Sequence, residues 1–431
     1  MNLNEKEKEY GRKLFLIEGI LSSSARRSMI GTILTAFALV LGSDERQIGI
    51  LNSVRRLAGF LQLFTNHLLE RTGSKRKLYI YVYVVARTMC ILLALLPLLT
   101  FSPLSLNVVW VLISIIFIFS CTDTIGIVLK KTWMSELTPT EIRGRYFGLR
   151  NIFVGLSGML VGYFSSLYVD YWRNAGKEIL GFQSLFIFTA ILGFSTLFIA
   201  VKIPEMSTSQ KKRGLKDFLN SFKAPFRDRD FFIWMVFRGC YSFGVGFAGP
   251  FFAVYLLREL NLSLATVAIY TAIGNTASIA LSGLWGSMAD KYGNKKVLII
   301  SCIGKSIFPA LWIFTTGIGS IWAILWLGFV HSVRGLNSAQ QITMLNMSLW
   351  LSPEKTRPMY IACESTIVTV LSAVSPFIGG IVLGAIGDNN LELSFLGWNY
   401  SLRAMHILFF ISAVLRSTSS TILAKVKSDS P

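Results

Sequence analysis

Long apolar runs separated by short polar segments dominate the pattern of the 431-residue chain. A helix that rises about 1.5 Å per residue needs about 20 apolar residues to cross the hydrocarbon core, and these runs reach that length. They are too long, and alternate too little, to be strands of a membrane barrel. The pattern therefore predicts twelve membrane-spanning helices, at 14–41, 48–69, 78–100, 106–129, 146–168, 182–203, 231–257, 263–286, 297–316, 320–349, 359–386 and 402–424.

Composition supports an all-α membrane protein, because 53% of the residues are hydrophobic and only 15% are charged, against about 25% in soluble domains. A net charge of +19 points to nucleic acid in a soluble protein, but here the basic residues gather in alternate connections. These connections contain residues 71–77, 130–131, 143–145, 291–296 and 355–357. Basic connections stay in the cytoplasm. We therefore expect a multi-pass protein of the cytoplasmic (inner) cell membrane, with both termini inside and no nucleic-acid partner.

A polar and basic stretch at 204–229 separates two groups of six predicted spans. It predicts an N-terminal half at 1–203, a cytoplasmic linker at 204–229 and a C-terminal half at 230–431. The linker carries Lys211, Lys212, Arg213 and Lys216. These residues are typical of a segment that contacts anionic membrane lipids, and equally of a solvated connection that fixes topology.

The two halves repeat each other at their loops. Glu70-Arg71-Thr72-Gly73-Ser74-Lys75-Arg76 matches Asp290-Lys291-Tyr292-Gly293-Asn294-Lys295-Lys296, 220 positions later. Pro139, Arg143 and Tyr146 match Pro353, Arg357 and Tyr360, 214 positions later. Two matches in the same order and on the same face predict pseudo-symmetric six-helix halves related by an axis along the membrane normal. This is an architecture of transporters that bind solute where the halves meet.

These residues resemble the loop signature of the major facilitator superfamily, which is Gly, three residues, Asp, a basic residue, any residue, Gly and a basic pair. Residues 286–296 fit it well, whereas the first copy has Asn66 at the position of Gly286 and Glu70 in place of the acid Asp290. The resemblance covers nearly the whole chain. It implies a transporter of bacterial or archaeal type with the twelve-helix fold and alternating access.

The resemblance also implies a cytoplasmic gate, in which Glu70 faces the helix start near Met359 and Asp290 faces the one near Tyr146. A glycine allows close helix approach, and a helix N-terminus stabilises a carboxylate. The alternative is that these loops only fix topology and tight turns. The gate residues predicted on this basis are Glu70, Arg71, Gly73, Gly286, Asp290, Lys291, Gly293, Arg143 and Arg357.

Charged and polar residues lie inside the predicted spans, where each charge costs about 2.5–3.5 kcal/mol on insertion scales and is expected to face the bundle interior. The basic residues outnumber the acids, which favours an anionic solute. The alternative is inter-half ion pairing with Glu18, Asp123 and Glu364, together with snorkelling of Arg87, Lys305 and Arg416 on helices that the resemblance places at the periphery. The candidate solute-binding residues are Arg26, Arg27, Arg56, Asp123, Arg238, Asn275, His331, Arg334, Asn337 and Gln341. In the tenth span, His331, Arg334, Ser338 and Gln341 are expected to form one polar stripe at helical spacing.

Coupling to protons needs a group that titrates as the cavity alternates, and Glu18, Asp123 and Glu364 are the candidates. The fourth span has Thr122, Asp123 and Thr124 where many proton-coupled members carry arginine, and the fifth lacks the Gly-Pro motif of drug antiporters. Both departures count against proton-drug antiport.

We find no motif of a hydrolase, a metal site or an ATP-binding loop, so the sequence favours a transporter over an enzyme and implies no cofactor. The expected function is secondary transport of a small solute. The alternatives are a proton-coupled exporter of lipophilic drugs and a lipid-handling protein of the same fold. One chain already contains both halves, so we expect a monomer.

Overall fold

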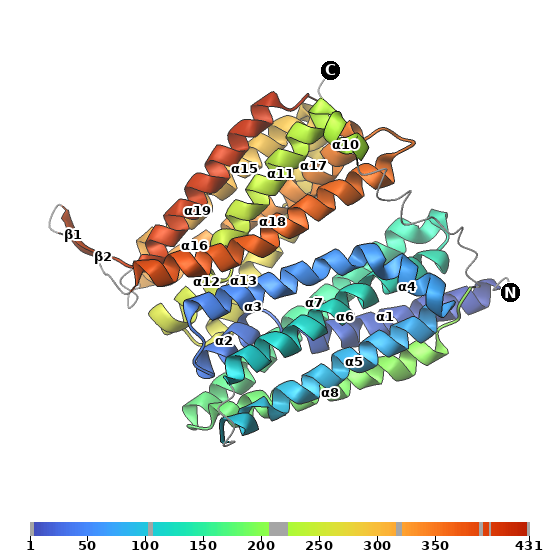
Figure 1. The fold of residues 1–431 in the computed structure, drawn as a ribbon, viewed down its shortest axis with the longest axis horizontal. Helices are drawn as coiled ribbons and strands as arrows, with labels where there is room; N and C mark the ends of the chain where they lie inside the picture. The colour runs from blue at the N-terminus through green and yellow to red at the C-terminus, as the bar shows by residue number, and fades with distance from the viewer. Residues whose placement is uncertain are drawn as a thin grey trace. The chain divides into compact units, whose positions relative to one another are not determined.

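The computed structural model describes residues 4–101, 107–206, 223–315, 321–387, 391–395 and 398–428, and nearly all of them lie in helices (Figure 1). The first half contains α1 (Glu5–Arg27), α2 (Thr32–Val40), α3 (Glu45–Leu57), the 3₁₀ helix η1 (Ala58–Phe64), α4 (Thr65–Thr72), α5 (Lys75–Leu95), η2 (Leu96–Phe101), α6 (Val108–Glu136), α7 (Thr140–Asn174) and α8 (Glu178–Lys202). Most of the predicted linker, including its lysines at 211, 212 and 216, lies outside the described residues.

The second half begins with the short helix α10 (Lys223–Arg227). It continues with α11 (Arg229–Ala248), α12 (Phe251–Val254), the π-helical turn η3 (Tyr255–Glu259), α13 (Leu264–Ala280), α14 (Ser282–Tyr292), α15 (Asn294–Leu311), η4 (Trp312–Thr315), α16 (Ile321–Ser332), η5 (Val333–Gly335), α17 (Leu336–Leu351), α18 (Arg357–Ile386), α19 (Ala404–Thr421) and η6 (Ile422–Lys425). The connection between α18 and α19 includes an antiparallel hairpin of β1 (Leu391–Phe395) and β2 (Trp398–Leu402), which the sequence pattern did not predict.

Each of the twelve predicted spans coincides with one helix or with a run of consecutive helices, which confirms the fold class. Among the described residues, 8 helices are long and apolar enough to cross a membrane, or 9 when α13 and α14, bent by 41°, count as one span. The remaining predicted spans, 14–41, 48–69 and 320–349, are interrupted. The first breaks at Gly31, which has a φ of 84°, and the other two contain 3₁₀ segments.

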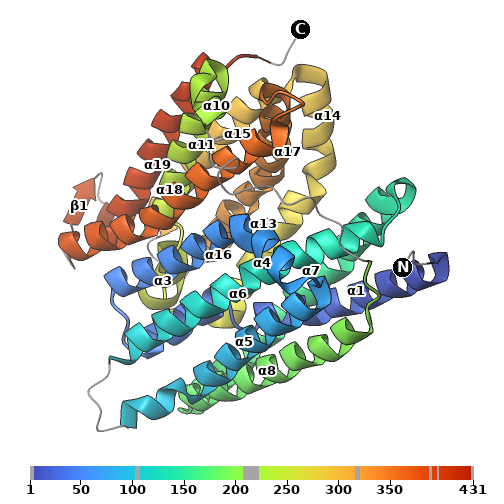
Figure 2. The same ribbon diagram turned by 45° about the vertical axis from the view of Figure 1, so that its right-hand side comes forward.

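The helices cluster into two compact units. The first consists of residues 1–43, 54–212 and 263–268, and the second of residues 44–53, 213–262 and 269–431. In the first unit, α5 packs between α6 and α8 and lies beside α8 in both ribbon views (Figures 1 and 2). In the second unit, α11 packs on α18 and α19, and α15 packs on α17 and α19.

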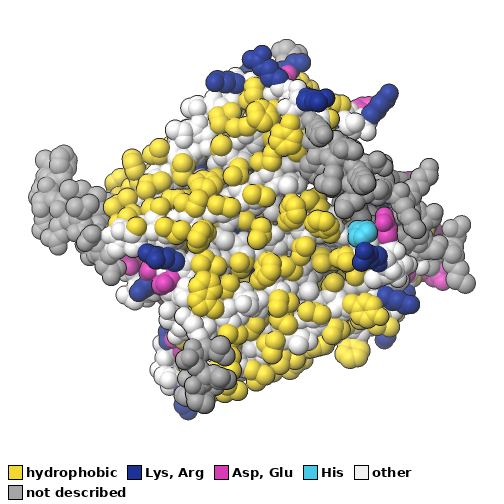
Figure 3. All heavy atoms as spheres, in the orientation of Figure 1, with side chains coloured by type: hydrophobic (Ala, Val, Ile, Leu, Met, Phe, Trp, Pro, Cys, Tyr) yellow, Lys and Arg dark blue, Asp and Glu magenta, His cyan; other side chains and the backbone are white. Residues whose placement is uncertain are grey.

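Apolar side chains cover long stretches of the helix surfaces, as expected for a protein that faces lipid. Figure 3 shows one face on which hydrophobic side chains spread widely between groups of Lys and Arg. The α7 helix is the clearest example, because only 22% of its most apolar 18-residue stretch is buried inside the protein. Its exposed residues include Leu149, Ile152, Leu156, Leu160 and Phe164.

Close contact between α11 and α18 is possible because glycine lies at their interface. A Cβ atom at Gly379 of α18 would lie 2.2 Å from the backbone carbonyl oxygen of Phe247 in α11. Both sides of that contact are backbone or Cβ atoms, so neither can rotate away. Gly379 therefore sets the distance between the two helices that form the centre of the second unit.

We predict that Gly379→Ala lowers the melting temperature of the purified protein, because overpacking of a tight interface costs about 1–3 kcal/mol. The matched control is Gly283→Ala in α14, where a new Cβ meets no atom within 4 Å. That variant should be neutral or slightly stabilised, because alanine favours helix over glycine. Equal melting temperatures for the two variants would contradict the assigned role of Gly379.

Candidate functional site

A buried ion pair joins α1 to α6 inside the first unit. Lys130 Nζ lies 2.6 Å from Glu18 Oε1, and the side chains are 11% and 0% exposed. The hydroxyl of Tyr79 in α5 donates to the same carboxylate oxygen at 2.7 Å. Glu18 therefore connects three helices. The prediction that Lys130 belongs to an inner connection was wrong, because α6 continues to Glu136 and its packing buries the lysine.

The Tyr83 ring extends this network along α5. Lys130 Nζ lies 5.6 Å from the ring centroid, and the guanidinium carbon of Arg87 lies 4.9 Å from it, so two cations share one aromatic ring. Glycines make room for these large groups. A Cβ at Gly126 would lie 2.1 Å from Tyr83, and a Cβ at Gly193 would lie 2.2 Å from Arg87. Arg87 is 2% exposed, so the expected snorkelling is wrong for it.

Asp123, the second carboxylate inside the predicted spans of the first unit, has a more accessible partner. Arg26 Nη1 lies 3.2 Å from Asp123 Oδ2, and the side chain of Arg26 is 46% exposed. Arg55 of α3 lies close enough for the charges of Arg26, Arg56 and Asp123 to act on it. Three of the predicted solute-binding residues thus lie together. Arg55 joins them, although the sequence analysis did not select it for this role.

Two further arginines of this unit lie against glycines of neighbouring helices. Arg27 packs beside Gly158 of α7, and Arg150 of α7 packs beside Gly19 of α1. The basic side chains of this region therefore outnumber its acids, Glu18 and Asp123, within the described part of the unit. Such an arrangement can bind a carboxylate or phosphate through charge-assisted hydrogen bonds.

In the second unit, the predicted Arg238 and Glu364 pair with each other. Arg238 Nε lies 2.7 Å from Glu364 Oε1, with the side chains 22% and 6% exposed. Arg238 Nη1 also lies 2.6 Å from the sulfur of Met344. This pair connects α11 to α18, the two helices that also meet at Gly379, so the inter-half pairing expected for Glu364 is wrong.

A second polar network surrounds Gln340 of α17. Its amide accepts from Lys305 Nζ at 2.8 Å and donates to the hydroxyl of Tyr241 at 2.6 Å. Arg416 is 2% exposed and donates to the carbonyls of Gly244 and Lys305. The snorkelling expected for Arg416 is therefore wrong, because α19 packs its guanidinium against α11 and α15.

The other predicted residues of the second unit do not share one environment. His331 is 4% exposed, stacks on Tyr270 and contacts Trp312, whereas Gln341 is exposed. The predicted polar stripe is therefore wrong for the tenth span, since the 3₁₀ turn η5 interrupts the helix between them. Asn275, Arg334 and Asn337 are half-buried, and Arg334 packs against Gly274 of α13.

The repeated loops contain the tight turns that their glycines predicted. Gly73 and Gly293 have φ angles of 66° and 85°, in the region that favours glycine. Arg143 donates to the carbonyls of Ser135 and Thr138, at the end of α6. Lys291 lies over the ring of Tyr292. The proposed facing of Glu70 and Asp290 to helix starts in the opposite half stays a prediction, as do the gate roles of Arg71, Gly286 and Arg357.

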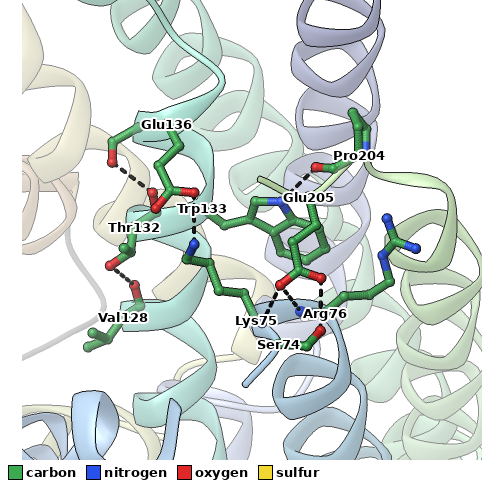
Figure 4. Close-up of polar contacts among 10 residues, drawn as sticks. Ser74, Lys75, Arg76, Val128, Thr132, Trp133, Glu136, Pro204 and Glu205 are labelled. Atoms are coloured by element: carbon green, nitrogen blue, oxygen red, sulfur yellow. Dashed lines mark hydrogen bonds and ion pairs between the residues drawn. The ribbon is translucent and has the colours of Figure 1, made fainter. Parts of the chain in front are cut away.

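The loop after α4 is held by the first residues of the predicted linker (Figure 4). Glu205 accepts from the hydroxyl of Ser74 at 2.8 Å and from the backbone N–H of Lys75 at 2.5 Å, at the N-terminus of α5. Lys75 Nζ lies 2.9 Å from Glu136 Oε2 and its side chain is 1% exposed. The interpretation of Lys75 as a loop charge was therefore incomplete.

Contacts at the helix ends repeat between the two units. Arg76 donates to the carbonyl of Ile203 after α8, and Lys295 donates to the carbonyl of Val426 after α19, each at 2.6 Å. The two donors stand one position apart in the repeat, since Arg76 aligns with Lys296. In both halves, however, the loop after the second helix binds the end of the sixth helix.

No group of three or more His, Cys, Asp or Glu residues close enough to hold a metal ion is found within the described ranges. The contacts found at this site are ion pairs and hydrogen bonds. Arg26 is an exposed cation of this site that pairs with a carboxylate, and its guanidinium can exchange one carboxylate partner for another.

We predict that Glu18→Gln and Lys130→Met each lower the melting temperature strongly, since breaking a buried pair costs about 3–5 kcal/mol. The double variant Glu18→Gln/Lys130→Met should melt closer to the wild type than either single variant, because it leaves no unpaired charge. Thermal unfolding of the purified proteins measures this.

The control for that experiment is Glu9→Gln, which removes the exposed pair between Glu9 and Lys13 at the start of α1. It should leave the melting temperature unchanged. Additive losses in the double variant would show that Glu18 and Lys130 do not act as a pair.

Comparison with known proteins gives a family match over most of the chain. A family model described as the Major Facilitator Superfamily matches residues 18–256 and 238–420. The chain is similar to the crystal structure of the nucleoside transporter NupG, with a TM-score of 0.68 and 16% sequence identity over 96% of this chain and 98% of that one. The structural similarity supports the fold.

Two curated relatives match part of the chain. The cis,cis-muconate transport protein of Acinetobacter baylyi is 26% identical over 219 residues, which are 48% of this chain and 51% of that protein. The class H tetracycline resistance protein of Pasteurella multocida is 26% identical over 175 residues, which are 39% of this chain and 41% of that protein. The chain thus spans about half the length of the curated relatives it matches.

Proposed function

The chain belongs to the Major Facilitator Superfamily, and on that basis we propose that it is a secondary transporter that moves a small anionic solute by alternating access. The observation that carries the anionic substrate class is the accessible guanidinium of Arg26, which has only Asp123 as its carboxylate partner among the described residues. Guanidinium groups bind carboxylate and phosphate well because their donors match the geometry of these anions.

The surrounding charge supports the same substrate class. Arg27, Arg55 and Arg56 add positive charge near Arg26, and the acids of the region are fewer. The solute site in the first unit therefore consists of Arg26, Arg27, Arg56 and Asp123. From the second unit we propose Arg238, Asn275, His331, Arg334, Asn337 and Gln341 as further solute-binding residues, with His331 acting through its aromatic neighbours.

A relative supports an organic anion as solute. The cis,cis-muconate transport protein is named for a substrate that is a dicarboxylate, and a solute of that class fits an accessible guanidinium. Protons are the proposed coupling ion, with Glu18, Asp123 and Glu364 as the candidate carriers. The loop residues Glu70, Arg71, Gly73, Gly286, Asp290, Lys291, Gly293, Arg143 and Arg357 form the proposed gate.

The second candidate function is proton-coupled export of lipophilic drugs. The match to a tetracycline resistance protein favours it. In that case Glu18 and Asp123 would bind a cationic drug, and the arginines would serve as their structural partners. Under either function we propose a monomer in the cytoplasmic membrane, with both termini in the cytoplasm and membrane lipids as its surroundings.

A thermal-shift screen on the purified protein distinguishes these functions, because a ligand that binds the folded state raises the melting temperature. The panel contains cis,cis-muconate, benzoate and inorganic phosphate as anions, uridine and xylose as neutral solutes, and tetracycline and tetraphenylphosphonium as drug-like compounds. We expect stabilisation by at least one anion. Stabilisation by tetraphenylphosphonium or tetracycline alone would support drug export instead.

We further predict that Arg26→Gln weakens binding of the stabilising anion at least tenfold, because a hydrogen bond to a charged group contributes about 1.5–3 kcal/mol. The matched control is Arg173→Gln at the C-terminal end of α7, where the arginine pairs with Glu178. That variant should bind the anion like the wild type. Unchanged affinity in Arg26→Gln would remove Arg26 from the solute site.

A further inference from the structure

Three carboxylates inside the predicted spans have a cation partner, and these pairs differ in one respect. The cation that pairs with Glu18 is 11% exposed and the one that pairs with Glu364 is 22% exposed. The cation that pairs with Asp123 is 46% exposed. Only in the last pair can a solute reach the cation readily while the protein carboxylate remains beside it.

The distances within the three ion pairs, and the number of partners, also distinguish Asp123 from Glu18 and Glu364. Glu18 is held at 2.6 Å by Lys130 and at 2.7 Å by Tyr79, and Glu364 is held at 2.7 Å by Arg238. The Asp123 contact with Arg26 is a single, longer one of 3.2 Å. Asp123 is therefore the carboxylate that exchanges its partner with the least rearrangement.

Charged and titratable groups on four described helices lie close enough to Asp123 to interact with it. They are Arg26 of α1, Arg55 of α3, Tyr83 and Cys90 of α5, and Lys130, which lies about two helical turns beyond Asp123 in α6. Lys130 is already engaged by Glu18 and by the hydroxyl of Ser22. Arg26 is thus the cation that pairs with Asp123 and that a solute can reach.

We infer that Asp123 occupies Arg26 when no solute is bound, and that a solute carboxylate displaces Asp123 from Arg26 while Asp123 takes up one proton. This inference rests on the proposed function and makes the transporter a symporter of anion and proton. Glu18 and Glu364 are then structural partners rather than proton carriers.

The step balances in charge and in atoms. The ion pair of Arg26 with Asp123 breaks, an ion pair of Arg26 with the solute forms, and an O–H bond forms at Asp123 with a proton from a hydronium ion on the side where the solute enters, which leaves water. Nothing is oxidised or reduced. For a monocarboxylate such as benzoate, one negative charge and one proton enter together, so the site has the same net charge when empty and when loaded. Both states then face the same cost of moving their charge through the membrane.

Binding of benzoate and of cis,cis-muconate to the purified protein, measured by calorimetry between pH 5.5 and 8.5, tests the inference. Both ligands are ionised in this range, because carboxylic acids titrate near about pH 4. In the wild type, the Kd should rise about tenfold per pH unit and about one proton should be taken up per anion. The sign follows because binding needs a proton, so it weakens as protons become scarce.

Asp123→Asn removes the competing carboxylate and the proton acceptor but keeps the size of the side chain. It should bind the anion with a Kd that is independent of pH and, at pH 8.5, at least tenfold lower than in the wild type. The matched control is Glu178→Gln, which removes a carboxylate from an arginine pair at the start of α8 and should keep the wild-type pH dependence.

Three outcomes would overturn the inference while leaving the proposed function intact. The wild type could bind the anion without proton uptake, Asp123→Asn could keep the pH dependence, or Glu18→Gln or Glu364→Gln could abolish it instead. If neither anion binds the wild type, the anionic substrate class fails and the inference fails with it. If Asp123→Asn does not fold, the proton uptake of the wild type alone decides.

Discussion

The cost of placing charge in an apolar interior governs the arrangement of this protein's helices, because each buried charge needs an opposite charge, a dipole or an aromatic face beside it. Glu18 brings α1, α5 and α6 together through Lys130 and Tyr79. Arg238 and Glu364 do the same for α11 and α18. Where no acid is at hand, Arg87 lies over Tyr83 and Arg416 binds backbone carbonyls. The charged groups thus select which helices pack together, whereas the lipid-facing residues give no such selection.

Glycine makes room for these large charged and aromatic side chains between the helices. Arg87 fits against α8 only because Gly193 has no side chain, and Tyr83 fits against α6 only because of Gly126. A guanidinium or a phenol is large. It fits between two closely packed helices only where one of them has a glycine, which leaves the space of a side chain free. Each of these glycines therefore serves the electrostatic network as well as the packing, and the two constraints cannot be separated at these positions.

The number and order of the spans could be predicted because run length alone decides whether a helix crosses the membrane. The turns at Gly73 and Gly293 could be predicted because their loops repeat. The network could not, since a sequence pattern assigns Lys130 to a loop when its partner, Glu18, lies 112 residues away. The buried amide of the tenth span is Gln340 rather than the selected Gln341, because a 3₁₀ turn changes the rotation of the helix by an amount that periodicity does not reveal.

The repeat offers a further way to separate architecture from function. With the offset of 220 that relates the loops, Glu18 corresponds to Arg238, and with the offset of 214, Arg150 corresponds to Glu364. Each half thus has an acid and a base at these two positions with their signs exchanged, but Arg238 and Glu364 pair with each other, whereas Glu18 pairs with Lys130. Arg26 corresponds to Gly246, which has no side chain and lies against Ser375. The architecture of a half therefore does not require a cation at this position, so the accessible guanidinium of the first unit needs an explanation outside packing, and binding of a negatively charged solute provides one.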